Sequence, residues 1–378
     1  MKLSCLQENL SRGLSVVGRA VATRTTLPIT NNVLLTTDQS RLKLVATNLE
    51  MAISYWLGAK VEEEGAITVP ARLLTEFANS LPNENIDISL SPQTKTLELK
   101  CARFEARISG VDAADFPPIP TVDEGITTKI DAETIRQAIS QVAFAAASEE
   151  SRPVLTGVDV QFDNDRLTLA AADGFRLAVY KMSLATPVSE PTEVIVPARI
   201  LTELNRLMTD GEEMVEITVN PNKSQALFRL KNTELVSQLV QGTFPQYAQL
   251  IPESHNTRVT VDVAEFLRAT RTASIFARDG SGIVRLVITG GSELTPGKLT
   301  ISARSEEIGD DIGEIDAIVE GDEAKIAFNG KYLVDVLGAL RESKVTLELT
   351  NPSSPGVLRP EGTDNYIHVI MPMFVQWD

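Results

Sequence analysis

Apolar residues recur along the chain with two periods that alternate. Near the start, an apolar stripe at helical spacing predicts a helix over 7–24. The stripe consists of Leu10, Leu14, Val17 and Val21. Runs in which apolar and polar residues alternate, such as 42–47 and 167–172, predict half-buried strands. Pro70 and Pro197 each open a second helix, at the position where a missing N–H costs least. The order helix, strands, helix, strands predicts an α+β fold.

The same order of patterns occurs three times. Residues 67–77 recur almost unchanged at 195–204 and more faintly at 326–336. A second landmark closes each copy at spacings of 128 and 127 residues, as Phe116-Pro117, Phe244-Pro245 and Met371-Pro372. The first helical stripe returns 125 residues later as Ile135, Ile139 and Val142. Because landmarks that share one spacing indicate tandem repeats, we predict three copies of one domain, at 1–122, 127–253 and 257–378.

Charge is distributed unevenly over these elements. The 378 residues carry a net charge of −16, which at face value argues against nucleic acid as a partner. The predicted helices, however, hold 13 basic and 7 acidic residues, whereas the rest of the chain holds 22 basic and 44 acidic residues. These helices are 7–24, 70–81, 132–148, 197–209, 263–278 and 330–344. Since a duplex responds to the local field, the basic helices favour a DNA-facing surface.

The candidate DNA contacts are basic residues on or beside these helices. They are Arg12, Arg19, Arg24, Arg72, Arg152, Arg199, Arg206, Arg268, Arg271 and Lys331. Arg12 and Arg19 lie seven residues apart, on the side of the helix opposite the apolar stripe. Glu149 and Glu150 would oppose a strong contact at Arg152. Phosphate contacts need no particular base sequence, so this set predicts binding to double-stranded DNA without sequence preference.

The sequence carries no pattern typical of catalysis. His255 and His368 are the only histidines, and zinc-site, phosphate-loop and nucleophile-elbow motifs are missing. We therefore expect a protein that is not an enzyme and has no metal or cofactor. Cys5 and Cys101 are expected to be reduced core residues of a cytoplasmic protein. No apolar run is long enough for a membrane span, and the first residues lack a signal-peptide pattern.

Four segments resemble a known family, the β subunit of bacterial DNA polymerase III, which forms sliding clamps. The segments are 26–29 (Thr-Leu-Pro-Ile), 171–178, 194–197 and 369–373, and the resemblance covers essentially the whole chain. It implies a head-to-tail homodimeric ring with helices lining the hole and β-sheets outside. It also implies a processivity factor that encircles duplex DNA and tethers its partners. Those partners would be the DNA polymerase III alpha subunit, the clamp-loader complex, and other clamp-binding polymerases and repair proteins.

The resemblance places a pocket for partner peptides between the second and third copies. Its residues would be Leu155, Ala172, Gly174, Phe175, Arg176, Leu177, Pro245, Gln249, Leu250, Val369, Ile370, Met371, Pro372 and Met373. Most are apolar, and methionine adapts to several ligands. The chain departs from the family pattern at Ala172, usually Thr, at Gln249, usually basic, and in the longer aromatic tail 374–378. Phe374 and Trp377 of this tail are candidates for covering part of the pocket.

The resemblance also implies a dimer interface between the edge of the first copy and the third copy of a partner. Its residues would be Lys100, Arg103, Phe104, Ala106, Arg107, Ile108, Ile275, Phe276, Glu306 and Glu307. Basic residues of the first copy would then face acidic residues of the third. Closure of a head-to-tail contact gives a ring.

Three alternatives to this interpretation stay open. Two-repeat clamps trimerise, and three repeats in one chain disfavour that class. A ring-shaped scaffold that binds proteins without encircling DNA is the main alternative, and the basic helices disfavour it. A metal-dependent nuclease is a more distant possibility, because no carboxylates are marked out by their spacing.

Overall fold

The computed structural model describes residues 1–23, 25–149, 151–209, 211, 213–277, 282–292 and 295–377. The predicted DNA contact Arg24 lies outside the described residues. The fold is α+β, as predicted, and the described part of the chain repeats one order of elements three times. In each copy a strand leads into a helix, further strands follow, and a second helix precedes three closing strands.

The elements of the first copy are β1 (Lys2–Leu6), α1 (Gln7–Val17), β2 (Asn32–Asp38), β3 (Arg41–Thr47), β4 (Met51–Gly58), β5 (Lys60–Glu63), β6 (Ala66–Pro70), α2 (Ala71–Ser80), β7 (Asn85–Ser91), β8 (Thr96–Cys101) and β9 (Phe104–Ser109). Those of the second copy are β10 (Ile126–Asp131), α3 (Ala132–Val142), β11 (Gly157–Asp163), β12 (Arg166–Ala172), β13 (Arg176–Ser183), β14 (Thr192–Pro197), α4 (Ala198–Leu207), β15 (Met214–Val219), β16 (Gln225–Arg229) and β17 (Thr233–Gln238). Those of the third copy are β18 (Thr257–Asp262), α5 (Val263–Phe276), β19 (Ile283–Thr289), β20 (Gly297–Ser305), β21 (Gly309–Gly321), β22 (Ala324–Asn329), α6 (Gly330–Ala339), β23 (Lys344–Leu349), β24 (Gly356–Pro360) and β25 (Tyr366–Ile370).

The matched helical stripes form the core of their copies. Leu10, Leu14 and Val17 of α1 are buried, and so are the residues predicted to match them on α3. Pro70 ends β6 and caps α2, so it lies one position earlier than predicted. Burial of a continuous apolar stripe is the main source of stability for short helices like these.

The predicted helices are too long at three C-terminal ends. The helix predicted over 7–24 ends at Val17 and continues only as a short 3-10 turn, Gly18–Ala20. The one predicted over 132–148 ends at Val142, and the one over 330–344 ends at Ala339. After Ala339 the charged run 341–344 offers no apolar side chain to continue the buried face. Helix ends are set by such local changes, which a periodicity measured over several turns does not resolve.

The chain divides into two compact units, and the division passes through the second copy. The first unit comprises Met1–Glu133, Leu184–Glu190 and Ile200–Leu239. The second comprises Thr134–Ser183, Pro191–Arg199 and Val240–Asp378. Among the described residues the strands form three sheets, ordered β5-β1-β7-β8-β9, β10-β15-β16-β17-β4-β3-β2-β6, and β14-β11-β12-β13-β25-β24-β23-β18-β21-β20-β19-β22.

Neighbouring copies are joined by the same kind of strand pairing at both junctions. In the first unit β4 pairs antiparallel with β17, and Ile53 lies opposite Leu235. In the second unit β13 pairs antiparallel with β25, and Ala178 lies opposite His368. Since β4, β13 and β21 are equivalent in the repeat, as are β9, β17 and β25, each junction joins the fourth main strand of one copy to the last strand of the next.

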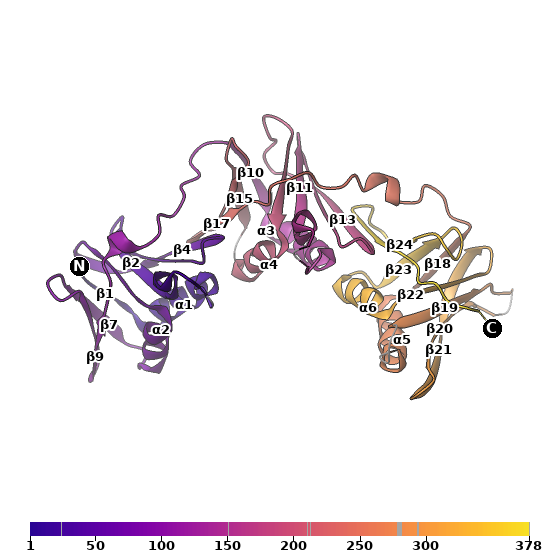
Figure 1. Cartoon of the computed structure of the whole chain (residues 1–378), viewed down its shortest axis with the longest axis horizontal. Helices are drawn as coiled ribbons and strands as arrows, with labels where there is room; N and C mark the ends of the chain where they lie inside the picture. The colour runs from indigo at the N-terminus through magenta and orange to yellow at the C-terminus, as the bar shows by residue number, and fades with distance from the viewer. Residues whose placement is uncertain are drawn as a thin grey trace. The chain divides into compact units, whose positions relative to one another are not determined.

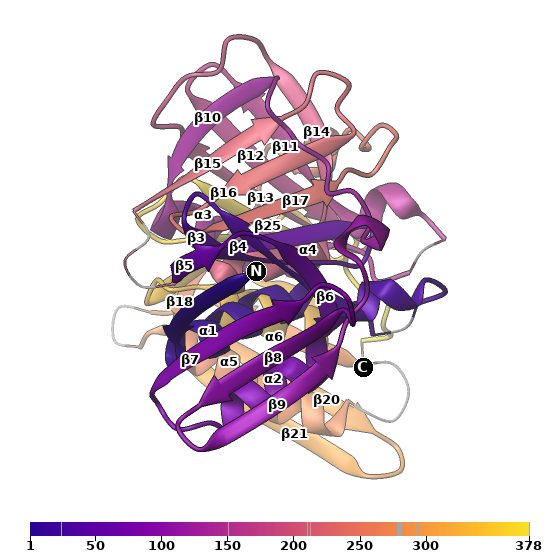
Figure 2. The same ribbon diagram turned by 90° about the vertical axis from the view of Figure 1, so that its left-hand side faces the viewer.

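In the described part of the chain, two strands equivalent to the junction strands, β9 and β21, each have an edge without a paired strand. β9 pairs with β8 alone, at the edge of the five-stranded sheet. Residues 309–317 of β21 pair with β20 on one side, whereas β18 pairs only with the later residues 318–321. In the first copy, α1 and α2 pack against each other, and α1 also contacts β1 of the five-stranded sheet and β3 and β4 of the eight-stranded sheet (Figure 1). Figure 2 shows β7, β8 and β9 side by side, with β9 outermost.

Candidate functional site

Two apolar clusters of the second unit bring together the core of the predicted docking pocket. Leu177 and Val369, from neighbouring strands β13 and β25, belong to one cluster. Leu155 belongs to another, with Ile195 and Phe244. Ala172 and Tyr247 pack against both clusters. The structure therefore places Leu155, Ala172 and Leu177 of the second copy near Val369 of the third copy.

The apolar residues in and around these clusters differ in how much of their surface is exposed to solvent. Phe175 is 58% exposed, Leu250 51% and Met371 41%. Leu155, Leu177, Val369 and Ile370 are buried in the core. Gly174, Pro245 and Gln249 are exposed, and Pro372 and Met373 are half-buried. A partner can therefore contact the exposed apolar side chains directly, whereas the buried ones shape the surface beneath.

A tight turn, residues 173–176, presents Phe175. Asp173 Oδ1 accepts hydrogen bonds from the backbone N–H groups of Phe175 (2.9 Å) and Arg176 (3.0 Å). Gly174 has φ +93°, a conformation that favours glycine. A Cβ at this position would also lie 3.3 Å from an Arg152 guanidinium nitrogen. The predicted DNA contact Arg152 thus lies next to this turn.

Arg176 is buried, with 8% of its surface exposed, and its guanidinium is fully engaged inside the protein. Nε donates to Asp173 Oδ2 at 3.0 Å, and the two terminal nitrogens donate to Asp335 Oδ2 at 2.7 Å and to the Phe144 carbonyl at 2.8 Å. The guanidinium also stacks on the Tyr332 ring at 4.4 Å. The guanidinium of Arg176, a predicted pocket residue, is thus held by hydrogen bonds and ring stacking within the protein.

A buried polar cluster beside Arg176 was not anticipated from the sequence. The Tyr366 hydroxyl donates to the Gln141 carbonyl at 2.9 Å and lies 3.1 Å from His368 Nδ1. His368 stacks on Phe144 with ring centroids 5.6 Å apart. Burial, with the charge of Arg176, lowers the pKa of His368 to about 3, so the ring is neutral. The signal available in the sequence was a lone histidine in an apolar strand, which is not specific.

A second unexpected group is Asp159 on β11. Its carboxyl is buried and accepts a hydrogen bond from Gln161 Nε2 at 2.8 Å. Burial, with the nearby charge of Glu193, raises the pKa of Asp159 to about 7. Burial and these two carboxyls raise the pKa of Tyr247 to about 12. The acidic pair therefore lies close to a side chain that packs against both apolar clusters.

The C-terminal tail runs along the edge of β22. Met373 N–H donates to the Ala327 carbonyl at 2.7 Å, and an Arg285 terminal nitrogen lies 3.4 Å from the Gln376 carbonyl. Trp377 contacts Arg285 and Lys325 and lines a cavity of about 490 Å³ on the third copy. Of the two tail residues considered for covering the pocket, Trp377 is thus held elsewhere on the third copy, and Phe374 is almost fully exposed.

The nine described candidates for DNA contact are all exposed. Several are already paired: Glu203 binds both Arg19, at 3.2 Å, and Arg206, at 2.5 Å, and Arg72 pairs with Glu76 at 2.7 Å. In the described residues the six α-helices hold eight basic and six acidic residues. The larger basic excess counted on the predicted helices therefore depends on residues that follow the helix ends.

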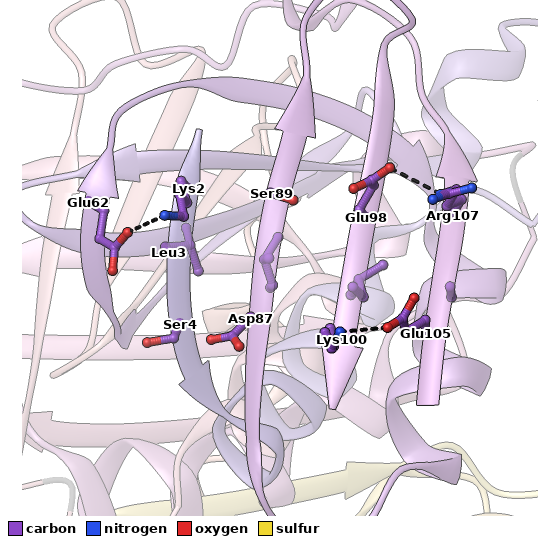
Figure 3. A pocket seen from close by; sticks show the side chains of 13 residues that line it. Lys2, Leu3, Ser4, Glu62, Asp87, Ser89, Glu98, Lys100, Glu105 and Arg107 are labelled. Atoms are coloured by element: carbon purple, nitrogen blue, oxygen red, sulfur yellow. Dashed lines mark hydrogen bonds and ion pairs between the residues drawn. The ribbon is translucent and has the colours of Figure 1, made fainter. Parts of the chain in front are cut away.

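The first-copy edge predicted for dimerisation carries charges that pair within its own sheet (Figure 3). Lys100 binds Glu105 at 2.6 Å and Arg107 binds Glu98 at 3.1 Å, around a shallow cavity of about 390 Å³. Phe104, Arg103 and Ile275 are exposed, whereas Ala106 and Phe276 are half-buried and Ile108 is buried in its own core. Glu306 and Glu307 are exposed beside the start of β21.

Other kinds of site have little support in the described part of the chain. No group of three or more His, Cys, Asp or Glu residues there is placed to hold a metal ion. Within the same residues, no helix combines the length and apolar character needed to cross a membrane. Cys5 and Cys101 are both free and buried, as predicted.

Three tandem domains, each with two helices and joined strand to strand, define a protein of the DNA-clamp class. Family models described as the N-terminal, central and C-terminal domains of the DNA polymerase III beta subunit match residues 1–120, 129–246 and 248–374. A Staphylococcus aureus protein named Beta sliding clamp is 32% identical over 364 residues, 94% of each chain. A Synechocystis protein of the same name is 32% identical over 394 residues, 99% of each chain.

Solved structures agree over the whole chain. The sliding clamp of Bacillus subtilis has a TM-score of 0.93 at 28% identity and covers 100% of both chains. A DnaN sliding clamp from Pseudomonas aeruginosa, bound to griselimycin, has a TM-score of 0.92 at 29% identity, with 99% of this chain and 100% of that one covered. The chain belongs to the family of DNA polymerase III beta subunits. Its function is that of a sliding clamp, a non-catalytic processivity factor that works with DNA and a DNA polymerase.

Proposed function

We propose that two copies of this chain close head to tail into a ring around duplex DNA, with domains at 1–122, 127–253 and 257–378 in each chain. The observation that carries the proposal is the repeated junction. Two junctions within the chain pair equivalent strands, and the strands equivalent to them, β9 and β21, keep free edges among the described residues. A second copy offers both missing partners, and two such contacts close a ring.

The repeat also supplies a register for the contact between chains. The pairs Ile53–Leu235 and Ala178–His368 occupy equivalent positions in the two internal junctions. On β21 the residue equivalent to Ile53 and Ala178 is Asp311, and on β9 the residue equivalent to Leu235 and His368 is Ala106. The repeat therefore predicts that Asp311 of one chain lies opposite Ala106 of the other. The next pair along is then Asp310 with Arg107, which brings opposite charges together. Opposite charges directly across two strands stabilise the pairing modestly.

Disulfide trapping tests this register. Cysteines at Ala106 and Asp311 should link the chains of a dimer, because facing Cβ atoms lie within the short range that a disulfide needs. Cysteines at Arg103 and Asp311 are the matched control and should link poorly. Replacing Ile275 and Phe276 with polar residues should give folded monomers. An unchanged mass of that variant, with no linkage of the first pair, would reject the interface.

For DNA we propose contacts between phosphates and the exposed basic residues on and beside the helices. Each phosphate contact adds about 0.9 to the slope of log affinity against log salt. Changing Arg24, Arg199 and Arg271 to Ala should lower this slope without creating a base preference. Lys60, exposed on β5, is the matched control. An unchanged slope in the triple variant would favour the protein-binding scaffold over DNA encirclement.

For partner proteins we propose docking on the surface formed by Phe175, Leu250 and Met371 over the two apolar clusters. The partners are the polymerase III alpha subunit, the clamp loader, and other clamp-binding polymerases and repair proteins, all in the cytoplasm. A synthetic peptide with Gln, then Leu and a further aromatic residue should bind, each buried anchor contributing about 1.5–3 kcal/mol.

Calorimetry with surface variants tests this docking. Leu250→Lys with Met371→Lys should abolish binding of the peptide and leave the dimer mass unchanged, since both side chains are exposed. Leu27→Lys, an equally apolar exposed position in the first copy, is the control. Wild-type affinity in the double variant would place the docking site elsewhere.

A further inference from the structure

We propose that Arg176 is a positioning residue that couples the docking surface to α6, so that binding of a partner peptide and the placement of α6 depend on each other. The inference rests on the docking role proposed above. Arg176 itself touches no partner in this scheme. It acts through the groups that its guanidinium holds on two sides.

On the docking side, Arg176 fixes the turn that presents Phe175. Its Nε holds Asp173 Oδ2 at 3.0 Å, and the other oxygen of that carboxylate holds the backbone N–H groups of Phe175 and Arg176. The Phe175 carbonyl in turn accepts the Met371 N–H at 2.8 Å. Two of the three exposed apolar residues of the docking surface, Phe175 and Met371, are therefore connected to one guanidinium through consecutive hydrogen bonds.

On the other side, the same guanidinium holds α6 of the third copy. It donates to Asp335 at 2.7 Å and stacks on Tyr332 one helical turn earlier. Its remaining terminal nitrogen binds the Phe144 carbonyl, just after α3 of the second copy. Charge-assisted hydrogen bonds in a buried setting are short-ranged and directional, so a displacement at one end weakens the contacts at the other.

The position of α6 matters because the helix begins beside Lys331, one of the candidate DNA contacts. Lys331 is exposed in the first turn, next to Tyr332 in the chain. A peptide that tightens the 173–176 turn would favour one placement of Asp335 and Tyr332, and hence of this first turn. Coupling of two binding events through a shared element is reciprocal.

Hydrogen exchange of the intact protein tests the coupling. With the synthetic peptide described above, binding should slow exchange of the α6 amides in the wild type about threefold or more. Asp335→Asn should lose this protection and bind the peptide about tenfold more weakly. Asp335→Glu keeps the charge and should recover most of both effects. Asp364→Asn, an exposed carboxyl before β25, is the control.

The outcomes separate the coupling from docking itself. If the wild type binds the peptide while α6 exchange is unchanged, the coupling is overturned and docking stands. If the wild type does not bind the peptide, the docking proposal fails first. Should Asp335→Asn fail to fold by circular dichroism, Asp335→Glu and the wild-type exchange measurement still decide. A variant that keeps full affinity without the Asp335 carboxylate also overturns the proposal.

Discussion

The two junctions between copies have the same backbone and different side chains. At the first, Asn48 Oδ1 accepts the N–H groups of Glu50 (3.0 Å) and Met51 (2.9 Å), as Asp173 does at the second for its own turn. Gln238 N–H donates to the Glu50 carbonyl at 2.8 Å, which matches the bond from Met371 to Phe175. The backbone that joins neighbouring copies therefore needs neither a buried arginine nor an acidic partner on a helix.

The side chains at equivalent positions show what the second junction adds. Met51 occupies the position of Arg176, Leu235 that of His368, and Leu49 that of Gly174. The first junction is thus apolar where the second carries a buried charge and a buried imidazole. A buried charge is costly unless it is paired, so Arg176, where the first junction has Met51, points to a role beyond joining copies.

The largest expected effect comes from replacing the buried arginine of the second junction with methionine, the residue found at the first junction. Arg176→Met leaves the carboxylates of Asp173 and Asp335 without their cation, and breaking a buried pair costs about 3–5 kcal/mol. Unfolding in urea should show a loss of this size, and Met51→Leu at the first junction should change stability by less than about 1.5 kcal/mol. A loss below about 1 kcal/mol for Arg176→Met would mean that the ion pairs are not needed for stability.

The sequence predicted the repeat and its strands well because these depend on local patterns. The strands expected at 42–47 and 167–172 are observed as Arg41–Thr47 and Arg166–Ala172, and the matched helical stripes are buried. Arg176 shows what local patterns miss. Its partner Asp335 lies 159 residues away, and no periodicity links the two positions. Arginine is mostly an exposed residue, so its burial follows from tertiary contacts alone.

The next effect concerns pH. The pKa of His368 is lowered to about 3 in the folded protein from its ordinary value of 6.5, so the unfolded chain takes up the proton first. The stability gained from the neutral ring is complete above pH 6.5 and is lost as pH falls toward 3. His368→Leu, the residue found at the first junction, should remove this dependence.

The measurement is urea unfolding of both proteins between pH 6 and pH 4. The stability of the wild type relative to His368→Leu should fall by up to about 1.4 kcal/mol per pH unit. The raised pKa of Asp159 has the opposite sign, since its stabilisation is lost as pH rises through about 7. Both proteins contain Asp159, so its contribution cancels in the difference. A flat difference would show that His368 is protonated in the folded state.

A smaller effect is expected from the turn residues. Gly174→Ala places a side chain at φ +93° and close to Arg152, which should cost about 1–2 kcal/mol. Leu49 adopts φ +75° at the equivalent position with much of its side chain exposed. Leu49→Gly relieves that strain while adding chain entropy, so its stability should stay within about 1 kcal/mol of the wild type. If Gly174→Ala and Leu49→Gly lowered the free energy of unfolding equally, the backbone strain would not depend on which turn carries it.

The sequence predicted which of the candidate residues lie close together better than which of them are exposed. The two motif segments 174–177 and 369–373 do meet, where the start of β13 pairs with the end of β25. The sequence did not predict which of these residues are exposed. Alternate residues of a strand point to opposite faces of the sheet, and a strand at a junction is covered on both faces. Ile108 illustrates the same limit, since its strand lies at an edge and its side chain lies in the core.

The smallest effect tests the departure at Ala172. The equivalent residue of the first junction, Thr47, donates to the Met51 carbonyl at 2.8 Å and accepts the Leu49 N–H at 3.0 Å. Thr47→Ala should cost about 1 kcal/mol, because the Met51 carbonyl keeps its second donor, the Asn48 N–H. Ala172→Thr should restore the missing pair of bonds at the second junction and stabilise it by a similar or smaller amount. Urea midpoints of the two single variants and the double variant measure both, and the changes should add, since the turns belong to separate units. Destabilisation by Ala172→Thr would mean that packing against Leu155 and Tyr247 leaves no room for the extra atoms, and that the alanine is required by the shape of the docking surface.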